Sequence, residues 1–401
     1  HWIAILSLLF FAMELRLPKL TIGSFSFYVT TSRLAIFALV MIGSIKLYRS
    51  LRDGFSDLFS HVIVPGLLFL CLAFISSLFG RSTTVGIEQV VFYTAFLGIF
   101  SLLMTCDEAD ILDSIPSQIF GLGVLLAIIA IIENFNVALR ICLHATFVPM
   151  ADSATWRGSW ATLQSNLLLG CFLVIAMVCG YVDRKRLPGW VFYLGSAILF
   201  IGIVFSESRL AVSGLFIFVL LLASRRRVVA LGVAVLAVSL LVLLAGEHVR
   251  VRPDWMHTGG GLWYIVDIYS SYRLTFWKSA LSMWWDNPFF GIGPGVFSTL
   301  LPDYDPRFPA GFQHPHNLPL RVLCETGLFG FIAFIAFAVS LAKRVFKGGL
   351  LERSWPLSVF LFFELFEEFS RDSFASLVLI LLIAYAVHLQ TRSGDVAIRP
   401  S

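Results

Sequence analysis

Long apolar runs recur along the whole chain, and they limit what it can fold into more than any other feature. The run VVALGVAVLAVSLLVLLAG, residues 228–246, carries no charged residue. Runs of about 15–20 apolar residues are long enough to cross or nearly cross a bilayer as helices. Hydrophobic residues make up 58% of the chain and charged residues only 13%, far from the average of soluble proteins. The pattern predicts an all-α polytopic membrane protein.

We expect about twelve transmembrane helices, and basic clusters set their orientation. The predicted spans are 2–15, 33–47, 60–79, 87–105, 116–135, 162–181, 189–206, 210–223, 228–246, 328–342, 355–369 and 373–390. Five basic clusters then fall on one face: KLYRSLR from Lys46, DRKR from Asp183, SRRR from Ser224, KRVFKGGLLER from Lys343, and the C-terminal TRSGDVAIR. By the positive-inside rule this face is cytoplasmic and holds both termini. Because the sequence begins with His1, we also expect further residues before it.

The opposite, outer face carries a large polar loop between the ninth and tenth spans. We therefore divide the chain into membrane helices (1–246), an outer loop (247–327), and membrane helices with a cytoplasmic tail (328–401). Within the loop, an apolar stripe of Leu274, Trp277, Leu281 and Trp284 predicts a helix lying in the membrane interface. Asp286, Asn287 and Pro288 should end that helix. The following GIGPG, from Gly291, suits either an anion-binding nest or a glycine-rich turn, and we favour the turn.

Arginines in short outer loops run against the topology bias, so each needs a reason. Arg81, Arg157, Arg209 and Arg371 are of this kind. Arg209 lies in a tight polar hairpin, where it could pair with Glu207 or reach lipid headgroups. We favour binding of a lipid phosphate, because a guanidinium matches phosphate oxygens with paired hydrogen bonds. Arg371 lies among acidic residues and more simply forms a local ion-pair network.

The segment HPHN, residues 314–317, places two histidines just before a helix-start pattern. Asn317 is a good N-cap and Pro319 is tolerated in the first turn. His316 would then lie at the positive end of the helix, where a neutral imidazole can accept a proton. A zinc site is the rival explanation, but no third ligand is evident. Arg321 and Glu325, spaced i,i+4, are interpreted first as a structural pair.

Three motifs in this order resemble the O-antigen ligase and O-antigen polymerase superfamily. They are SxSRxA from Ser206, YRLxFWxxAxxMWxDNPFFGIGPGxF from Tyr272, and HPHNxxLxxxxETGxxG from His314. The resemblance covers residues 206 to about 334 and is closest to the O-antigen ligases. It implies a GT-C-like, metal-independent glycosyltransferase that acts on the periplasmic face and uses an undecaprenyl-pyrophosphate-linked glycan as donor.

The resemblance also implies roles for individual residues. The family's essential arginines correspond to Arg209 and Arg273, and its essential histidine to His316. We expect Arg157 and Arg81 to add to pyrophosphate binding. A further group is expected to orient the loop or the acceptor: His314, Asn317 and Arg321.

The function predicted on this basis is ligation of O-antigen to lipid A–core in the bacterial inner membrane, without a cofactor. The partners would be the lipid-linked donor, the lipid A–core acceptor and membrane lipids, and not nucleic acid. Two enzymatic alternatives are a polymerase of O-antigen or exopolysaccharide and a protein O-oligosaccharyltransferase. A transporter of anionic lipids is the alternative from a different class, but it predicts ionisable residues at mid-membrane depth. Here the ionisable residues gather at one face.

Overall fold

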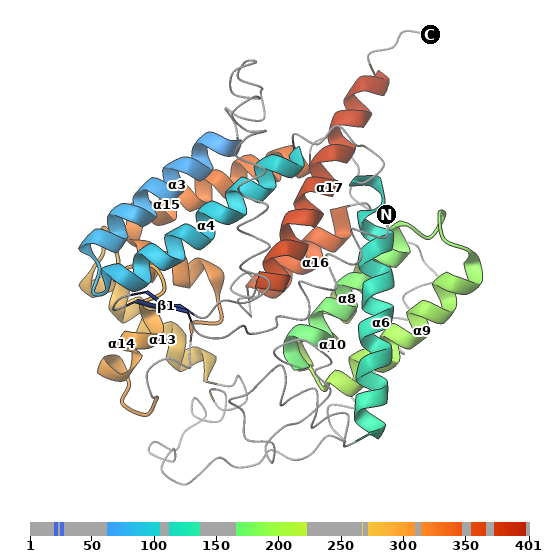
Figure 1. Ribbon diagram of the computed structural model, residues 1–401, viewed down its shortest axis with the longest axis horizontal. Coiled ribbons are helices and arrows are strands. Elements are labelled where there is room, and N and C mark those ends of the chain that lie inside the picture. The colour runs from blue at the N-terminus through green and yellow to red at the C-terminus, as the bar shows by residue number, and fades with distance from the viewer. Residues whose placement is uncertain are drawn as a thin grey trace.

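The computed structural model describes residues 20–22, 25–27, 62–104, 112–136, 166–222, 267, 272–308, 314–346, 354–365 and 373–397. Nearly all of them are helical, as the apolar runs predict (Figure 1). The helices are α3 (Val64–Phe79), α4 (Thr83–Met104), α6 (Ile115–Phe135), α8 (Asn166–Val182), α9 (Gly189–Ser206), α10 (Arg209–Leu222), α13 (Arg273–Asp286), α14 (Phe297–Tyr304), α15 (Leu318–Phe346), α16 (Trp355–Glu364) and α17 (Ser373–Ala397). Within the described residues, the exception to the all-α prediction is an antiparallel hairpin, in which β1 (Leu20–Ile22) pairs with β2 (Phe25–Phe27).

Several of these helices are long and apolar enough to cross a membrane. By length and composition, the described residues contain four such helices: Thr83–Phe100, Ile115–Phe135, Gly189–Ser206 and Leu318–Lys343. Shorter apolar helices accompany them: Val64–Phe79, Asn166–Val182, Leu210–Val219, Trp355–Glu364 and Val378–Leu389. The predicted spans 2–15, 33–47 and 228–246 lie outside the described residues, so the number twelve stays a prediction.

The membrane helices pack in two groups (Figure 1). In one group α3 packs on both α15 and α4, and in the other α6, α8 and α9 pack on one another. Helix α17 joins the groups, because it contacts α4, α15, α6 and α16. Helix α16 in turn packs on α8 and α10. Helices α13 and α14 form a cap beside the first group, and α13 packs on α15.

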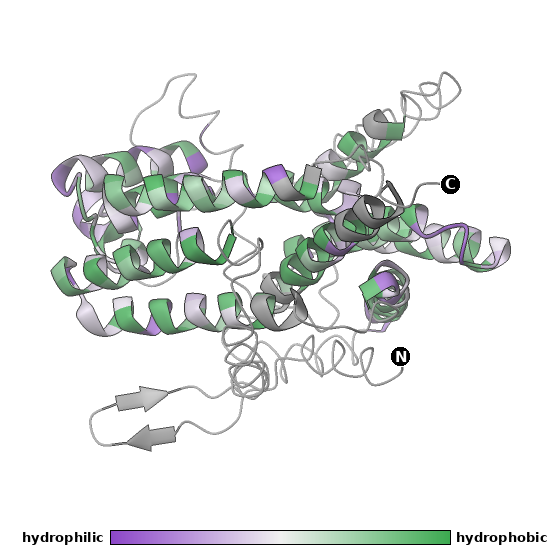
Figure 2. Ribbon diagram, turned by 90° about the horizontal axis from the view of Figure 1, so that it is seen from above, coloured by the Kyte–Doolittle hydropathy of each residue, from purple (hydrophilic) through white to green (hydrophobic). Residues whose placement is uncertain are grey.

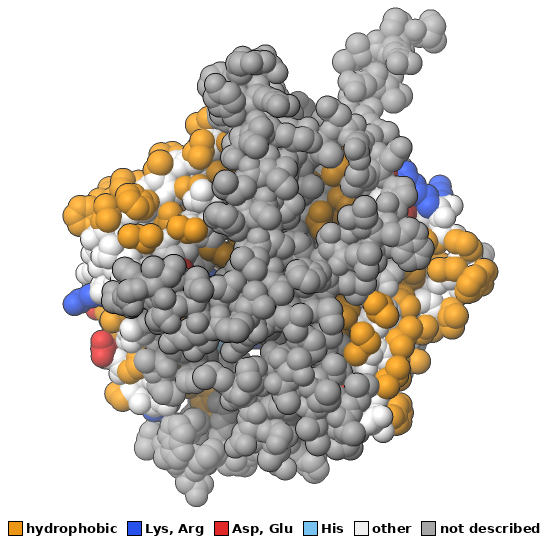
Figure 3. Space-filling view, viewed as in Figure 1, with side chains coloured by type: hydrophobic (Ala, Val, Ile, Leu, Met, Phe, Trp, Pro, Cys, Tyr) orange, Lys and Arg blue, Asp and Glu red, His pale blue; other side chains and the backbone are white. Residues whose placement is uncertain are grey.

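Apolar side chains cover the outside of the helix groups as well as their interior. The helices of the α3, α4 and α15 group are hydrophobic along most of their length (Figure 2). Exposed residues include Leu68 on α3 and Trp190 and Tyr193 on α9, and Figure 3 shows hydrophobic side chains on both flanks of the molecule. Such a surface is expected where lipid, rather than water, surrounds the helices.

Small residues let α6, α8 and α9 approach closely, as is common where lipid surrounds helices. A Cβ on Gly202 of α9 would lie 2.8 Å from the Cβ of Ala127 on α6 and 2.8 Å from a methyl carbon of Leu173 on α8. Ala127 and Leu173 are themselves fully buried. The three helices therefore form a tight unit in which a larger residue at position 202 has no space.

An ion-pair cluster joins three segments at the end of the molecule where α6 begins. The Arg186 guanidinium lies 3.2 Å from Asp113 Oδ2 and 3.5 Å from Asp183 Oδ1. His388 Nε2 of α17 lies 3.4 Å from the other oxygen of Asp113. Asp113, just before α6, thus links the basic DRKR segment, predicted to be cytoplasmic, to α17.

The opposite end is organised by a break in α15. Gly327 has φ 66° and ψ −170°, so the helix is interrupted between residues 318–326 and 328–346. The freed backbone groups exchange hydrogen bonds with the segment that follows α13. Two amides of that segment donate to α15, Ile292 to the Cys324 carbonyl (3.0 Å) and Gly293 to the Glu325 carbonyl (2.9 Å). Two amides after the break donate back, Leu328 to the Pro288 carbonyl (2.8 Å) and Phe329 to the Phe289 carbonyl (3.3 Å).

The end of α3 seals this contact. The Ser76 hydroxyl is fully buried and lies 2.6 Å from the Phe290 carbonyl and 2.8 Å from the Glu325 carbonyl. A Cβ on Gly80 would lie 2.6 Å from the Ile292 carbonyl oxygen, so only glycine fits there without a backbone shift. The cap, α3 and α15 are thereby joined through main-chain contacts.

We predict that Gly291→Ala destabilises the protein. Gly291 has φ 70°, and a Cβ there would lie 2.5 Å from the Glu325 carbonyl oxygen, so the substitution combines strain with a backbone clash. The free energy of unfolding should fall by about 1–3 kcal/mol. Thermal unfolding in detergent measures the effect. Gly121→Ala on α6 is the matched control, because its Cβ would meet nothing within 4 Å. Equal unfolding temperatures for the two variants would contradict the prediction.

Candidate functional site

The predicted outer ends of the helices gather at one end of the molecule. The side-chain amide of Asn166, at the start of α8, donates to the Ser206 carbonyl at the end of α9 (3.0 Å). The Asn317 side-chain amide, just before α15, donates to the Leu365 carbonyl just after α16 (3.0 Å). The Arg81 amide, between α3 and α4, donates to the Ile292 carbonyl (2.9 Å). Helix ends that are distant in sequence are thus joined in pairs, and the pair made by Asn317 lies at HPHN.

The HPHN segment lies directly against α13. The indole Nε1 of Trp277 donates to the Pro315 carbonyl, between the two histidines, at 2.9 Å. The rings of His314 and His316 lie 4.0 Å apart, centroid to centroid, and the His316 ring lies 5.8 Å from that of Phe276. His316 has φ 52°, in the left-handed region. Both histidines are therefore held at the face of α13 that carries Trp277.

Asn317 caps α15 as predicted. Its Oδ1 accepts a hydrogen bond from the Leu320 amide at 2.9 Å, and its carbonyl accepts from the Arg321 amide at 3.0 Å. Arg321 and Glu325 form the predicted pair, with Nε and Oε2 3.0 Å apart and both side chains almost fully buried. The pair fixes the helical segment between the N-cap and the break at Gly327.

Arg273 is the first residue of α13 and is spaced i,i+4 from Trp277, so the two share a face of the helix. That face is the one that contacts Pro315. Trp277, one turn after Arg273, thus joins α13 to the segment between the two histidines. Arg209 begins α10, but its side chain lies outside the described part of the structure, as do all of Arg157 and Arg371.

Helix α16 connects the start of α10 with the histidines. A Cβ on Gly214 of α10 would clash with the Phe363 ring, so the two helices are in close contact there. Two residues beyond Phe363, the Leu365 carbonyl accepts the hydrogen bond of Asn317, the residue after His316. Helix α10, at Gly214, and the HPHN segment, through Asn317, therefore both contact the last residues of α16.

The GIGPG segment forms a turn and not an anion nest. The amides of Gly291, Ile292 and Gly293 all donate to backbone carbonyls, those of Asn287, Cys324 and Glu325. These amides are therefore not directed at an anion.

Arg81 has an exposed side chain near the end of α13. The Tyr304 hydroxyl donates to Asp286 Oδ2 at 2.7 Å. Burial and the Asp286 carboxylate raise the pKa of Tyr304 to about 12, and the charge of Arg81 acts in the opposite direction. Arg81 therefore lies beside this pair, and Tyr304 remains protonated at neutral pH.

The interfacial stripe needs one correction. Trp284 packs against the core of the cap, and the neighbouring Trp285 is the exposed tryptophan, with 75% of its surface accessible. The buried face of α13 carries Phe276, Ser279, Ala280 and Met283. The other face borders an open cavity of about 560 Å³, lined by Leu274, Trp277, Lys278, Leu281, Ser282, Trp285 and Asp286.

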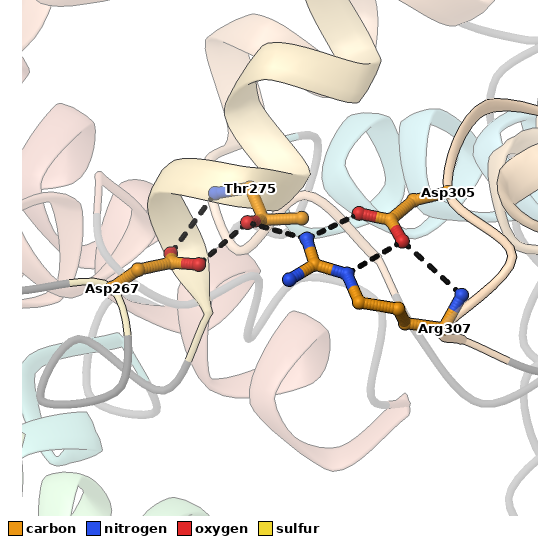
Figure 4. A network of polar contacts seen from close by, with 4 residues as sticks. All are labelled: Asp267, Thr275, Asp305 and Arg307. Atoms are coloured by element: carbon orange, nitrogen blue, oxygen red, sulfur yellow. Dashed lines mark hydrogen bonds and ion pairs between the residues drawn. The ribbon is translucent and has the colours of Figure 1, made fainter. Parts of the chain in front are cut away.

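Sequence reasoning missed a polar network at the start of α13 (Figure 4). Asp267 accepts hydrogen bonds from the amide and the hydroxyl of Thr275, and Arg307 reaches both Thr275 and Asp305. Burial alone would raise the pKa of Asp305, but the hydrogen bonds and charge of Arg307 outweigh it and lower this pKa. The short spacing of Asp305 and Arg307 was a signal for their pairing, whereas nothing local pointed to Asp267.

Two buried carboxylates at the same end were also missed. Glu133, in the last turns of α6, is fully buried, and Glu364, the last residue of α16, is 3% exposed. An acidic residue inside an apolar run is the signal that could have identified them. As for metals, the described residues contain no group of three or more His, Cys, Asp or Glu side chains that could hold an ion.

The comparisons with known proteins agree with the motifs. No curated protein matches the chain. A family model described as O-antigen ligase matches residues 194–335, which extend from α9 into α15. The matched segment contains Arg209, Arg273 and His316. Over residues 194–335 the chain is thus similar to the O-antigen ligases, which supports the resemblance to the O-antigen ligase and O-antigen polymerase superfamily.

Proposed function

We propose that this protein is a glycosyltransferase that moves a glycan from undecaprenyl pyrophosphate to a sugar hydroxyl of lipid A–core. The observation that carries the proposal is the hydrogen bond from Trp277 to the Pro315 carbonyl. It joins the helix that begins with Arg273 to the segment that holds His314 and His316. This contact supports a site in which a cation suited to phosphate and a base suited to a hydroxyl act on one substrate.

The proposed reaction is a single displacement. His316 takes the proton of the acceptor hydroxyl, and the oxygen attacks the anomeric carbon of the donor glycan. The bond between that carbon and the pyrophosphate oxygen breaks, which inverts the anomeric centre. Arg209 and Arg273 stabilise the charge that develops on the leaving pyrophosphate, the kind of contribution that is usually largest in catalysis. Arg81 and Arg157 add positive charge near the donor. His314, Asn317 and Arg321 hold the loop for the acceptor.

The proposed location follows from the distribution of charged residues along the chain. We place the site on the periplasmic face of the inner membrane, with both termini in the cytoplasm, because the basic clusters lie on the opposite face. The aromatic cap of α13 and α14 would cover the glycan, and the lipid tail would lie among the apolar helices. The buried carboxylates Glu133 and Glu364 lie near helix ends, which favours chemistry at one face over transport through the centre.

Ligation is favoured over polymerisation or transfer to protein, because the chain has a single dominant outer loop. We predict that a deletion strain makes lipopolysaccharide with rough core only, while finished polymer remains on undecaprenol. A gel of lipopolysaccharide, with extraction of the lipid-linked polymer, tests this. Core carrying a single repeat unit would instead assign the protein as a polymerase, and unchanged lipopolysaccharide would reject both assignments.

Arg273→Lys and Arg209→Lys should each strongly impair transfer, because lysine keeps the charge but loses the planar two-point contact with phosphate. We expect losses of about 10–100-fold, as for removal of strong charge-assisted contacts. Arg81→Lys should be mild. The measurement is glycan transfer from undecaprenyl pyrophosphate to purified acceptor in detergent.

Arg184→Lys is the matched control for the arginine variants. Its guanidinium lies 3.8 Å from the ring centre of Tyr181, at the end of the molecule opposite to the site. It should transfer glycan at the normal rate. Normal transfer by Arg273→Lys would remove the pyrophosphate role from that residue.

His316→Ala should lose about 10²–10⁴-fold in rate, as is typical for removal of a positioned base, and His314→Ala should lose less. Donor binding should persist in both variants, because the arginines hold the pyrophosphate. The same transfer assay with and without EDTA distinguishes a base from a metal site. Equal losses at both histidines together with inhibition by EDTA would show a metal site and reject the assignment of His316.

A further inference from the structure

The backbone enters α13 in a conformation that needs support. Tyr272, the residue before Arg273, has φ 64° and caps the helix without a side-chain hydrogen bond. A left-handed conformation is unusual for a bulky aromatic residue, and it persists only where the surroundings enforce it. The Tyr272 side chain is 4% exposed, and its amide donates to the Asp267 carbonyl at 2.7 Å. The direction in which Arg273 leaves the backbone therefore depends on contacts outside α13.

Asp267 provides the cap that Tyr272 does not. Its Oδ1 accepts from the Thr275 amide at 3.1 Å and its Oδ2 from the Thr275 hydroxyl at 2.5 Å. A carboxylate at the start of a helix satisfies open amides and meets the positive end of the helix dipole. Asp267 thus contacts the residues on both sides of Arg273, at positions 272 and 275.

Arg307 supports Thr275 from the other side (Figure 4). Its Nη2 lies 3.4 Å from the Thr275 hydroxyl oxygen and 2.6 Å from Asp305 Oδ2, and its Nε lies 2.9 Å from Asp305 Oδ1. The two-point contact with Asp305 fixes the guanidinium plane. It also balances a positive charge that would otherwise oppose the positive helix end and Arg273.

Aromatic packing joins the same segment to the histidines. The Phe308 ring lies 5.5 Å from that of Tyr272 and 4.8 Å from that of Phe276. Phe276 is the residue whose ring approaches His316. The segment 305–308 therefore contacts the support of Arg273 through Arg307 and the neighbourhood of His316 through Phe308.

We infer that Asp267, Thr275, Asp305 and Arg307 form a positioning network that directs Arg273 toward the donor pyrophosphate. The inference rests on the proposed function, since it takes Arg273 as the pyrophosphate ligand. Arg307 acts through Thr275 and the helix start, and it is not a catalytic residue. In this network Arg307 lies near the start of α13, and Asp305 holds its guanidinium.

The test uses Thr275→Val, which removes the hydroxyl at similar volume, and Thr275→Ser, which keeps it. Arg307→Lys removes the two-point contact, and Arg184→Lys is the matched control. Each variant is made in the full chain, with and without Arg273→Lys. Three quantities are measured in detergent: the Kd for undecaprenyl pyrophosphate, the KM for the acceptor, and the unfolding temperature.

We expect Thr275→Val and Arg307→Lys to weaken undecaprenyl pyrophosphate binding by about 5–10-fold, while the acceptor KM changes by less than about twofold. Thr275→Ser and Arg184→Lys should bind the donor normally. On the Arg273→Lys background, Thr275→Val and Arg307→Lys should weaken binding by less than about twofold, because residues that act through one group are not additive.

Other outcomes separate the inference from the proposed function. If Thr275→Val or Arg307→Lys weakens donor binding by the same factor with and without Arg273→Lys, Arg307 contacts the donor itself or acts elsewhere. That result would overturn the inference. A parallel loss of donor binding, acceptor KM and unfolding temperature would reduce the network to structural support. Unchanged donor binding in Thr275→Val and Arg307→Lys also overturns it, with the proposed function intact. If Arg273→Lys alone binds the donor normally, both fail.

Discussion

Four backbone hydrogen bonds, exchanged between residues 288–293 and 324–329, hold the cap on the membrane helices. They exist because Gly327 interrupts α15 and leaves carbonyls and amides that need partners. The segment after α13 supplies those partners, and α3 closes the contact through Ser76. Since α13 carries Arg273 and α15 begins next to His316, the relative position of the two candidate groups follows from this exchange. Burial keeps water from competing for these hydrogen bonds.

Local signals were enough to predict much of this arrangement. Within the described residues, apolar runs long enough for a bilayer are helices, and α9 begins and ends at the predicted residues 189 and 206. Asn317 caps α15 because its side chain reaches an amide only three residues away. Arg321 and Glu325 pair because one turn of a helix brings them together. In each case, residues close together in the sequence determine the outcome, so the sequence contains the necessary information.

The features that were missed depend on contacts between distant segments. Asp267 caps a helix that begins six residues later. Arg307 lies in the segment after α14 and contacts Thr275 from 32 residues away in the sequence. The choice between Trp284 and Trp285 as the exposed residue is made by packing on α14 and α15, because both fit an amphipathic pattern. The left-handed conformation of Tyr272 has no signal in residue type, because bulky aromatic residues rarely adopt it. Histidine is enriched in this region, but that tendency is too weak to identify His316 from the sequence.

The hydrogen bond from Trp277 reaches a main-chain oxygen and not a side chain. Any residue at position 315 offers a carbonyl, whereas the donor must be a side chain that carries an N–H or O–H group at this distance, as the indole does. The conformation of the loop between the histidines thus depends on the side chain of Trp277, 38 positions away in the chain. Divergent descendants of this sequence can exchange the proline and retain the loop, but a lineage that loses the tryptophan must find a new way to hold it.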